Sequence, residues 1–445
     1  DVVIQITSQV ILDDGISWQT YWSTRTPSNL YAIVYRDTEA DLTWTDPAGD
    51  VPFRIYISTD GVNYTKKGTT LAGDNTYTAT GLTAGTLYYF KVVAYSGANE
   101  SPSTNVWDTY MKWTIDTTKA GSAADTFVLP VSANTGSYFV DWGDGGVEEE
   151  FTTTGNKSHT YAAQGTYQIK VRGGLTRILF GNSGDRLKLI YIDQWGNLKW
   201  SSFWVAFQGC SNMNGRYQDA PNLTGYATID LGNMFRDCAK FNWPVAHWDT
   251  SHCFRLERMF MDCILFNQNI SHFDTHLVGS FDSMLFGCSS FKQSLATFSL
   301  AAATNLSNIL KDCNINEVGT TTNYDETLVA WAAADVPNSL NFNGGGAKYG
   351  EGLVDNGTTD GVAANKLIQS GQNFLTTVTV GDVVYNTTDG TYALVTAIDS
   401  DTQLSISADI MASGEVYRIQ HGAGAKARAS LIIDDLWTIT DGGAL

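Results

Sequence analysis

Residues 234–238, Met-Phe-Arg-Asp-Cys, open a sequence unit that returns three times at intervals of 25 residues. The later copies are Met-Phe-Met-Asp-Cys at 259–263, Met-Leu-Phe-Gly-Cys at 284–288 and Ile-Leu-Lys-Asp-Cys at 309–313. An earlier copy, Ala-Phe-Gln-Gly-Cys at 206–210, ends 28 residues before the first. A fixed period of about 20–29 residues predicts a solenoid of leucine-rich-repeat type, in which each coil buries its apolar edge against its neighbours.

The same units place cysteines and aromatic residues at fixed positions, and we expect both sets to form ladders through the core. The cysteines share one repeat position and are predicted to act as small apolar side chains: Cys210, Cys238, Cys263, Cys288 and Cys313. Disulfides are the alternative, because coils about 4.8 Å apart lie within the Cα range of a bridge. Parallel side chains disfavour that alternative, and Cys253, which breaks the register, is expected to be a free thiol.

A second set of repeat positions follows each cysteine. The aromatic ladder is Trp248, Phe273 and Phe298, for which core or inter-coil stacking is expected first. The preceding Phe-Asn pairs at 241–242 and 266–267 become Phe-Lys at 291–292, and Asp-Thr becomes Ser299-Leu300 in the same unit. We therefore expect an irregular outer loop there. The repeated aspartates Asp237, Asp262 and Asp312 are expected to bond backbone amides in turns.

Composition narrows the class of protein. A chain of 445 residues should hold three or four domains, and 43% hydrophobic residues indicate a folded protein. Only 16% of residues are charged, which is typical of β-rich extracellular or virion proteins. The net charge of −19 argues against nucleic acid as a partner, because phosphate binding needs a basic face. The absence of an apolar run long enough to span a bilayer argues against membrane insertion.

The N-terminal quarter predicts an arm and a β-sandwich. Residues 1–27 alternate apolar and polar side chains, as expected for an arm that docks on a neighbouring protein or for an extra strand of the next domain. Residues 28–110 contain short alternating strands separated by turn residues. Within them, Gly-Leu-Thr-Ala-Gly-Thr-Leu-Tyr at 81–88 resembles the tyrosine corner of a fibronectin type III domain. That resemblance makes Trp44 the core tryptophan and Tyr88 the corner tyrosine.

Residues 111–174 predict a second small β unit. The segments 138–145, Tyr-Phe-Val-Asp-Trp-Gly-Asp-Gly, and 159–169 resemble a PKD-like β-sandwich. Asp141 and Asp144, with the acidic run that follows them, are candidate calcium ligands because hard cations prefer clustered carboxylate oxygens. A tight Asp-Gly turn beside a solvated acidic face is the alternative, and the one we favour.

Residues 175–350 resemble BspA-like leucine-rich-repeat surface proteins of bacteria and some bacteriophages. The resemblance rests on Asp-Gln-Trp-Gly at 193–196, Trp-Ser-Ser at 200–202, Asp-Ala-Pro-Asn-Leu at 219–223 and the 25-residue units. In that family a Gly/Ala/Tyr stretch, an Ala-Arg-rich helix and a terminal Trp-Thr-Ile-x-Asp-Gly-Gly complete the cap. Here the first is separated from the other two, which lie within 423–445.

We therefore expect residues 351–422 to be a domain inserted into the C-terminal cap. Short strands joined by Asp-Gly and Asp-Ser turns predict a small β-barrel or sandwich. It resembles a module of bacteriophage tail and fibre proteins, and an insertion at an exposed loop should project from the end of the solenoid. The predicted fold class is mainly β: two sandwiches, then a solenoid with a small β domain in its cap.

Catalytic motifs are absent from the sequence, and neither a catalytic residue nor a cofactor is predicted. His272 and His276 are four residues apart, but they fall in expected loops rather than on a helix, so solvated side chains are favoured over zinc ligands. Trp200 and Trp243 are the tryptophans least constrained by the repeat and remain candidates for stacking on a sugar.

Together these patterns favour a non-enzymatic bacteriophage virion protein, a tail, fibre or capsid-decorating component that adheres to the host surface. The expected partners are other virion proteins, through the N-terminal arm, and a host-surface glycan or protein, with multiple copies per particle. The alternative is a secreted or surface-attached bacterial BspA-like adhesin. A third class, an exported polysaccharide-degrading enzyme, would require a carboxylate pair about 5–9.5 Å apart in a groove.

Overall fold

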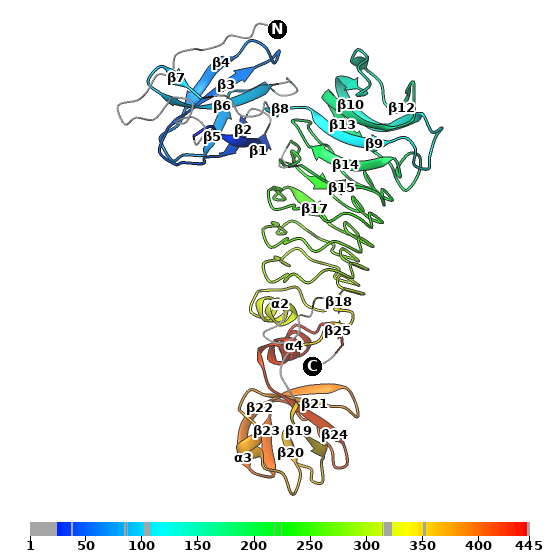
Figure 1. The fold of residues 1–445 in the computed structure, drawn as a ribbon. Coiled ribbons are helices and arrows are strands. Elements are labelled where there is room, and N and C mark those ends of the chain that lie inside the picture. The colour runs from blue at the N-terminus through cyan, green and yellow to red at the C-terminus, as the bar shows by residue number, and fades with distance from the viewer. Residues whose placement is uncertain are drawn as a thin grey trace.

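A computed structural model describes residues 25–36, 39–83, 86, 88–101, 107–217, 219–223, 225–313, 315, 323–349 and 353–442. The arm expected at residues 1–27 lies almost wholly outside this range. The described chain is mainly β. Figure 1 shows a β-sandwich and a larger sheet at one end, then a stack of coils, a helical segment, and a further β unit at the far end. Within the described residues, no helix has the length and apolar character needed to cross a bilayer.

The first unit is a sandwich of two sheets. One sheet holds β1 (Ser28–Arg36), β2 (Glu39–Thr45) and β5 (Thr76–Thr80); the other holds β4 (Thr65–Thr69), β3 (Phe53–Ser58), β6 (Tyr89–Ser96) and β7 (Asn99–Glu100), with β8 (Trp107–Asp108) on β6. Trp44 is buried and its ring packs edge-on against Phe53 at 5.3 Å. The backbone N–H of Thr83 donates to the Tyr88 hydroxyl at 3.1 Å. The predicted core tryptophan and tyrosine corner are thus both in place.

The second unit is one seven-stranded sheet: β9 (Met111–Asp116), β10 (Thr126–Asp141), β11 (Glu149–Phe151), β12 (Gly155–Thr160), β13 (Thr166–Ile178), β14 (Leu189–Gln194) and β15 (Asn214–Gly215). β14 pairs antiparallel with β9 and parallel with β15, which belongs to the first coil of the stack. β13 continues through residue 174, where we expected the boundary between the second β unit and the coils. One hydrophobic core extends from Met111 to Trp437.

The coils stack through short parallel pairings between successive turns of the chain. β16 (Ile229–Asp230) pairs with β17 (Cys253–Arg255), and isolated bridges join Arg255 to Ser280 and Ser280 to Asn305. Elsewhere each coil is a series of turns whose amides bond the next coil, as the Phe260 N–H does with Met284 O at 2.9 Å. This register reproduces the 25-residue period of the sequence.

The repeated aspartates occupy left-handed turns. Asp237, Asp262 and Asp312 have φ values of 62°, 58° and 63°, and Gly287 holds the same position at 73°. The expectation that their carboxylates bond backbone amides is wrong for the described residues, where no such bond is formed. Aspartate and glycine recur because they tolerate this backbone conformation better than most residues.

The interior cysteines are buried, and all six cysteines of the chain are free. Each of the last four in the ladder donates its thiol to a carbonyl of the preceding coil: Cys238 to Phe207 (3.1 Å), Cys263 to Phe235 (3.0 Å), Cys288 to Phe260 (2.9 Å) and Cys313 to Leu285 (2.9 Å). The disulfide alternative is thus not realised. The thiol is a small donor that joins neighbouring coils as well as filling space.

The polar repeat positions also bond the adjacent coil. Asn242 Oδ1 accepts the Asn267 N–H at 2.9 Å, and Asn267 Oδ1 accepts the Lys292 N–H at 2.9 Å. Thr275 Oγ1 donates to Ser299 O at 3.0 Å. Lys292 and Leu300 replace the Asn and Thr where the next layer is the cap instead of another coil. These departures therefore mark the end of the ladders. They do not indicate the irregular outer loop that we expected in this unit.

The cap is assembled from segments on both sides of the inserted unit. Helix α2 (Asn323–Ala332), with acidic residues in its first turn that favour a helix N-terminus, packs on α4 (Ala423–Ile433), and β18 (Asn341–Asn343) pairs with β25 (Thr438–Thr440). Between them lie β19 (Leu353–Thr358), β20 (Lys366–Ile368), α3 (Phe374–Thr377), β21 (Val383–Asn386), β22 (Thr391–Ser400), β23 (Gln403–Ile406) and β24 (Val416–Gln420).

These inserted elements form a six-stranded sheet with its own core around Phe374 and Tyr417. The unit is fastened to the cap: the Tyr349 hydroxyl donates to Gln420 Oε1 at 2.8 Å, and Arg428 Nη1 donates to the Tyr392 hydroxyl at 2.9 Å. Figure 1 places it at the end of the stack that is remote from the first sandwich.

Candidate binding groove on the coil stack

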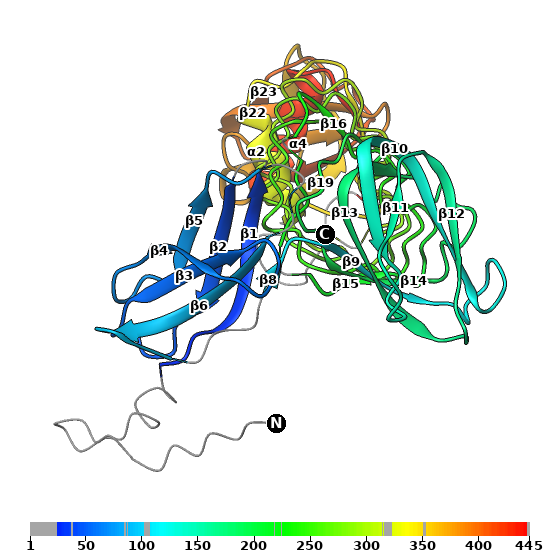
Figure 2. The ribbon, with the colours of Figure 1, turned by 90° about the horizontal axis from the view of Figure 1, so that it is seen from above.

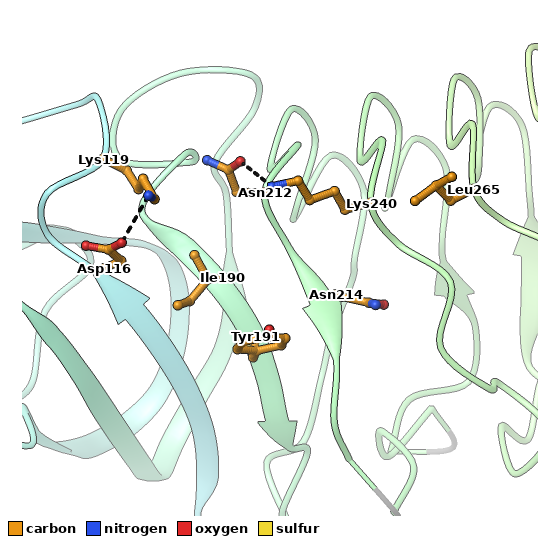
Figure 3. A pocket seen from close by; sticks show the side chains of 8 residues that line it. All are labelled: Asp116, Lys119, Ile190, Tyr191, Asn212, Asn214, Lys240 and Leu265. Carbon is orange, nitrogen blue, oxygen red and sulfur yellow. Dashed lines mark hydrogen bonds and ion pairs between the residues drawn. The ribbon is translucent and has the colours of Figure 1, made fainter.

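A groove with a volume of about 530 Å³ lies where the seven-stranded sheet meets the coils. Its walls come from the ends of β9 and β14 and from three successive coils, so it runs along the stack (Figure 3). The residues that line it are Asp116, Lys119, Ile190, Tyr191, Asn212, Asn214, Lys240 and Leu265.

The sheet side of the groove is fixed by the turn that follows β9. Asp116 Oδ1 accepts the N–H and the hydroxyl of Thr118 at 3.0 and 2.6 Å, and its Oδ2 lies 3.3 Å from Lys119 Nζ. Those contacts hold the pKa of Asp116 below its ordinary value, although burial alone would raise it. Lys119 remains 46% exposed, so its ammonium is available to a ligand.

Tyr191 supplies an aromatic side chain to the groove (Figure 3). The guanidinium of Arg216 stacks 3.8 Å from the centre of its ring, and the same guanidinium pairs with Asp193 at 2.6 Å. This cation–π contact and ion pair limit the motion of the ring. The half-buried Tyr191 therefore offers an ordered apolar surface to a ligand.

The coil side presents two amides whose orientations are fixed by the neighbouring backbone. Asn212 Nδ2 donates to Leu187 O at 2.9 Å, and its Oδ1 accepts Lys240 Nζ at 3.1 Å. Asn214 Oδ1 accepts the Asn242 N–H at 3.0 Å, which leaves its Nδ2 for other contacts. One coil further along, Leu265 is 49% exposed.

The chemistry of the groove suits recognition of a polyhydroxylated or polar chain. It combines ammonium and amide donors with an aromatic ring and an exposed apolar side chain, and it extends over several coils about 5 Å apart. Among its described lining residues Asp116 is the only carboxylate, whereas glycoside hydrolysis uses two. The described lining therefore does not supply that pair of carboxylates.

The candidate calcium ligands lie at the end of β10, where Asp141 is its last residue, and in the turn that follows it. Asp141 accepts the Gly143 N–H at 2.9 Å and pairs with Lys170 at 2.9 Å. Asp144 accepts the Gly146 N–H at 3.0 Å, and its Oδ2 contacts His159 Nε2 at 2.9 Å. The turn amide, helped by His159, lowers the pKa of Asp144. These contacts agree with the Asp-Gly turn interpretation, and no cluster of three potential metal ligands occurs in the described part of the chain.

The remaining candidates are distributed through the stack. His272 Nε2 contacts Val245 O at 2.7 Å, whereas His276 Nδ1 contacts Asp274 at 2.6 Å, so the two rings engage different partners. Trp200 is fully buried and cannot stack on a sugar, so the prediction that it is a candidate sugar-binding residue is wrong. Trp243 is half-buried, and its Nε1 donates to Tyr217 O at 2.7 Å.

The ladder residues are interior throughout. The five cysteines are buried, and Trp248, Phe273 and Phe298 are each 3% exposed. The groove itself was not predicted from the sequence. Lys119 and Lys240 are far apart in the chain, and neither belongs to a motif. The one indication in the sequence was an asparagine that recurs at the same position of successive coils, as Asn214 and Asn242. It indicates that this side of the coils is polar.

Comparison with known families matches two separate parts of the chain. Residues 25–108 match the fibronectin type III domain family, and residues 201–332 match the family described as Mycoplasma protein of unknown function, DUF285. The first unit is therefore a fibronectin type III domain. A search of curated proteins gives no match.

Solved structures similar to the chain include a fibronectin type III-like protein from Clostridium thermocellum, with 32% identity over 18% of this chain and 86% of that one and a TM-score of 0.17. A human fibronectin type III domain shares 24% identity over 19% of this chain and 81% of that one, also with a TM-score of 0.17. The FN5 domain of Drosophila Lar shares 17% identity over 19% and 92%, again with a TM-score of 0.17.

Proposed function

We propose that this protein is a non-enzymatic adhesion component of a bacteriophage virion, in the tail, a fibre or a capsid decoration. The N-terminal arm and the fibronectin type III domain attach it to the particle, and the coil stack with the inserted unit faces the host. The observation that carries the proposal is the groove over three coils, with donors and an aromatic ring but a single carboxylate. Many copies on one particle would turn weak contacts into firm attachment.

In this proposal the coil stack is a leucine-rich-repeat solenoid of BspA-like type, preceded by a PKD-like unit. Parallel pairings that repeat with the 25-residue period support the first assignment. The fibronectin type III domain at the opposite end from the inserted unit supports an elongated surface protein with two functional ends (Figure 1). Figure 2, a view from above, shows the sandwich and the seven-stranded sheet on opposite sides of the coil stack.

Two experiments test this function. Mass spectrometry of purified particles and host envelopes is expected to find the chain at fixed stoichiometry in the particles; its presence in envelopes alone would refute the virion assignment. Pull-down of host cells by the full chain then tests the groove. Tyr191→Ala with Lys240→Ala should weaken cell binding at least fivefold, whereas Lys66→Ala, at an exposed position of β4 in the first sandwich, should not change it. Equal cell binding by both variants would show that the groove does not take part in adhesion.

The second candidate function is a bacterial cell-surface adhesin. The match of residues 201–332 to a family named for Mycoplasma proteins favours it. Under that assignment the groove keeps its role, and the chain is found in envelopes instead of particles.

A further inference from the structure

A second cavity, of about 130 Å³, lies between the first two coils of the stack. Its walls combine three aromatic side chains, one carboxylate and two exposed rim residues: Tyr217, Trp243, Trp248, Asp219, Pro244 and His247. None of these residues lines the groove described above, and the chemistry of the two sites differs.

The aromatic walls are held in place by their neighbours. Trp243 is fixed by the hydrogen bond from its Nε1 to Tyr217 O, and its ring lies over Gly215, where a Cβ would come within 2.6 Å of Trp243 Cγ. Trp248 packs edge-on against Trp195 at 5.5 Å. The Tyr217 side chain is only 3% exposed, so its ring is a fixed part of the cavity wall.

The carboxylate of Asp219 is 1% exposed and supplies the negative end of the cavity. Its two oxygens accept the N–H groups of Trp195 at 3.0 Å and of Gly196 at 2.8 Å. Burial raises its pKa to about 7 despite these bonds. Lys112 exerts a favourable field on Asp219 but pairs directly with Asp108 at 2.7 Å. A buried carboxylate in this position gains from a cation placed beside it.

We propose that this cavity binds a small organic ammonium ion, of the choline or tetramethylammonium class. Aromatic rings attract such cations through the negative faces of their π systems, and a carboxylate beside them adds charge attraction. The volume also fits: one water takes roughly 30 Å³ in the liquid, so the cavity holds about four or five atoms of that size, which is the size of a trimethylammonium group. The proposal does not depend on the function proposed for the groove.

Calorimetric titration of the full chain with choline chloride, and with its uncharged isostere 3,3-dimethylbutan-1-ol, tests the role of charge. We expect choline to bind at least tenfold more tightly than the alcohol, because only the cation gains from Asp219 and the ring faces. Equal affinities would show an apolar pocket and overturn the proposal, as would absence of choline binding at 50 mM, a concentration of roughly ten times the ~5 mM dissociation constant expected of a small cage ligand.

Variants at His247, on the exposed rim, then locate the site without disturbing the core, and a variant at Asp219 tests the buried carboxylate. His247→Glu should strengthen choline binding severalfold and His247→Lys should weaken it by a similar factor, with the alcohol unaffected by either change. Asp219→Asn, whose amide oxygen can still accept the Trp195 N–H, should abolish the preference for choline; circular dichroism checks its fold. If none of the three substitutions changes the affinity for choline, choline binds elsewhere and the assignment is refuted.

The ammonium group could belong to a soluble compound or to a lipid headgroup. Flotation of the chain with phosphatidylcholine vesicles distinguishes these sources. Co-flotation that 50 mM choline abolishes would support the headgroup, and choline binding without co-flotation would support a soluble or polymer-borne ammonium group.

Discussion

Replacing Cys263 by alanine should destabilise the coil stack by about 2 kcal/mol. Removing the buried sulfur forfeits about 1 kcal/mol of transfer free energy and packing. The thiol bond to Phe235 O, 3.0 Å long, adds about 0.5–1 kcal/mol. That carbonyl also accepts the Cys238 N–H at 3.0 Å, so the substitution does not leave it without a partner, and the larger penalty of an orphaned polar group is avoided.

Cys253 provides the matched control. It is equally buried, but it lies outside the ladder and among the described residues its thiol donates no hydrogen bond. Cys253→Ala should therefore lose only the transfer and packing contribution of about 1 kcal/mol. The difference between the two variants isolates the hydrogen bond between coils.

The assay is urea denaturation followed by the appearance of reactive thiols. All six cysteines lie between residues 210 and 313, so labelling reports unfolding of the stack even though other domains unfold separately. Native thiols should stay unlabelled, because burial raises the pKa of Cys238, Cys263 and Cys288 well above the usual value. Losses that agree within about 0.3 kcal/mol for the two variants would refute a contribution from the thiol hydrogen bonds.

Three further predictions concern other parts of the stack and its cap. Gly287→Ala should lower the stability of the stack by about 1–2 kcal/mol in the same urea assay, because φ is 73° and a Cβ would lie 2.4 Å from Asp262 Oδ1; Asp262→Gly in the same chain should recover part of that loss. Asp219 has a folded-state pKa of about 7, above the 3.8 of an ordinary Asp, so its proton stabilises the fold at low pH and that stabilisation disappears as the pH rises through 7. Between pH 4 and 7 stability should therefore fall by up to about 1.4 kcal/mol per pH unit more in the parent chain than in Asp219→Asn, and equal pH profiles would contradict this. Arg428→Met should destabilise the cap by about 3–5 kcal/mol, because it removes the cation from a buried ion pair: the Asp441 side chain is 2% exposed and lies 2.8 Å from the guanidinium. Proteolysis at the inserted unit should accelerate, and unchanged cleavage would argue that the ion pair does not fasten the unit.

The sequence was sufficient to predict features whose cause is local or periodic. Tyr88 could be placed because a tyrosine corner is encoded in a few consecutive residues, and the Cys238 to Cys313 series because coils repeat in register. The role of those thiols as donors was missed, since a period shows that side chains stack but not which carbonyl each one meets. Trp200 was misjudged because it lies outside the strict period, although its burial is complete.

The two cavities were beyond prediction for a related reason. Each is formed by side chains from different coils or from the sheet and the coils, so its composition depends on how the stack begins. Lys119 reaches the groove only because β9 and β14 pair and bring the turn after Asp116 beside Asn212. No pattern in either segment encodes that meeting, which is a consequence of the sheet continuing into the first coil.

The departures from the repeat carry as much information as the repeat itself. A side chain that serves the next coil is useful only where a next coil exists, so Lys292 and Leu300 indicate where the ladders stop. At that layer the cap takes over with different contacts: Thr327 Oγ1 accepts the Leu295 N–H at 2.9 Å from helix α2. Because the cap closes the stack with α2, α4 and the β18–β25 pair, residues 353–420 can leave and return between β18 and α4 without interrupting a coil. The end of the stack is therefore the place where a foreign unit could be added at least cost to the repeats.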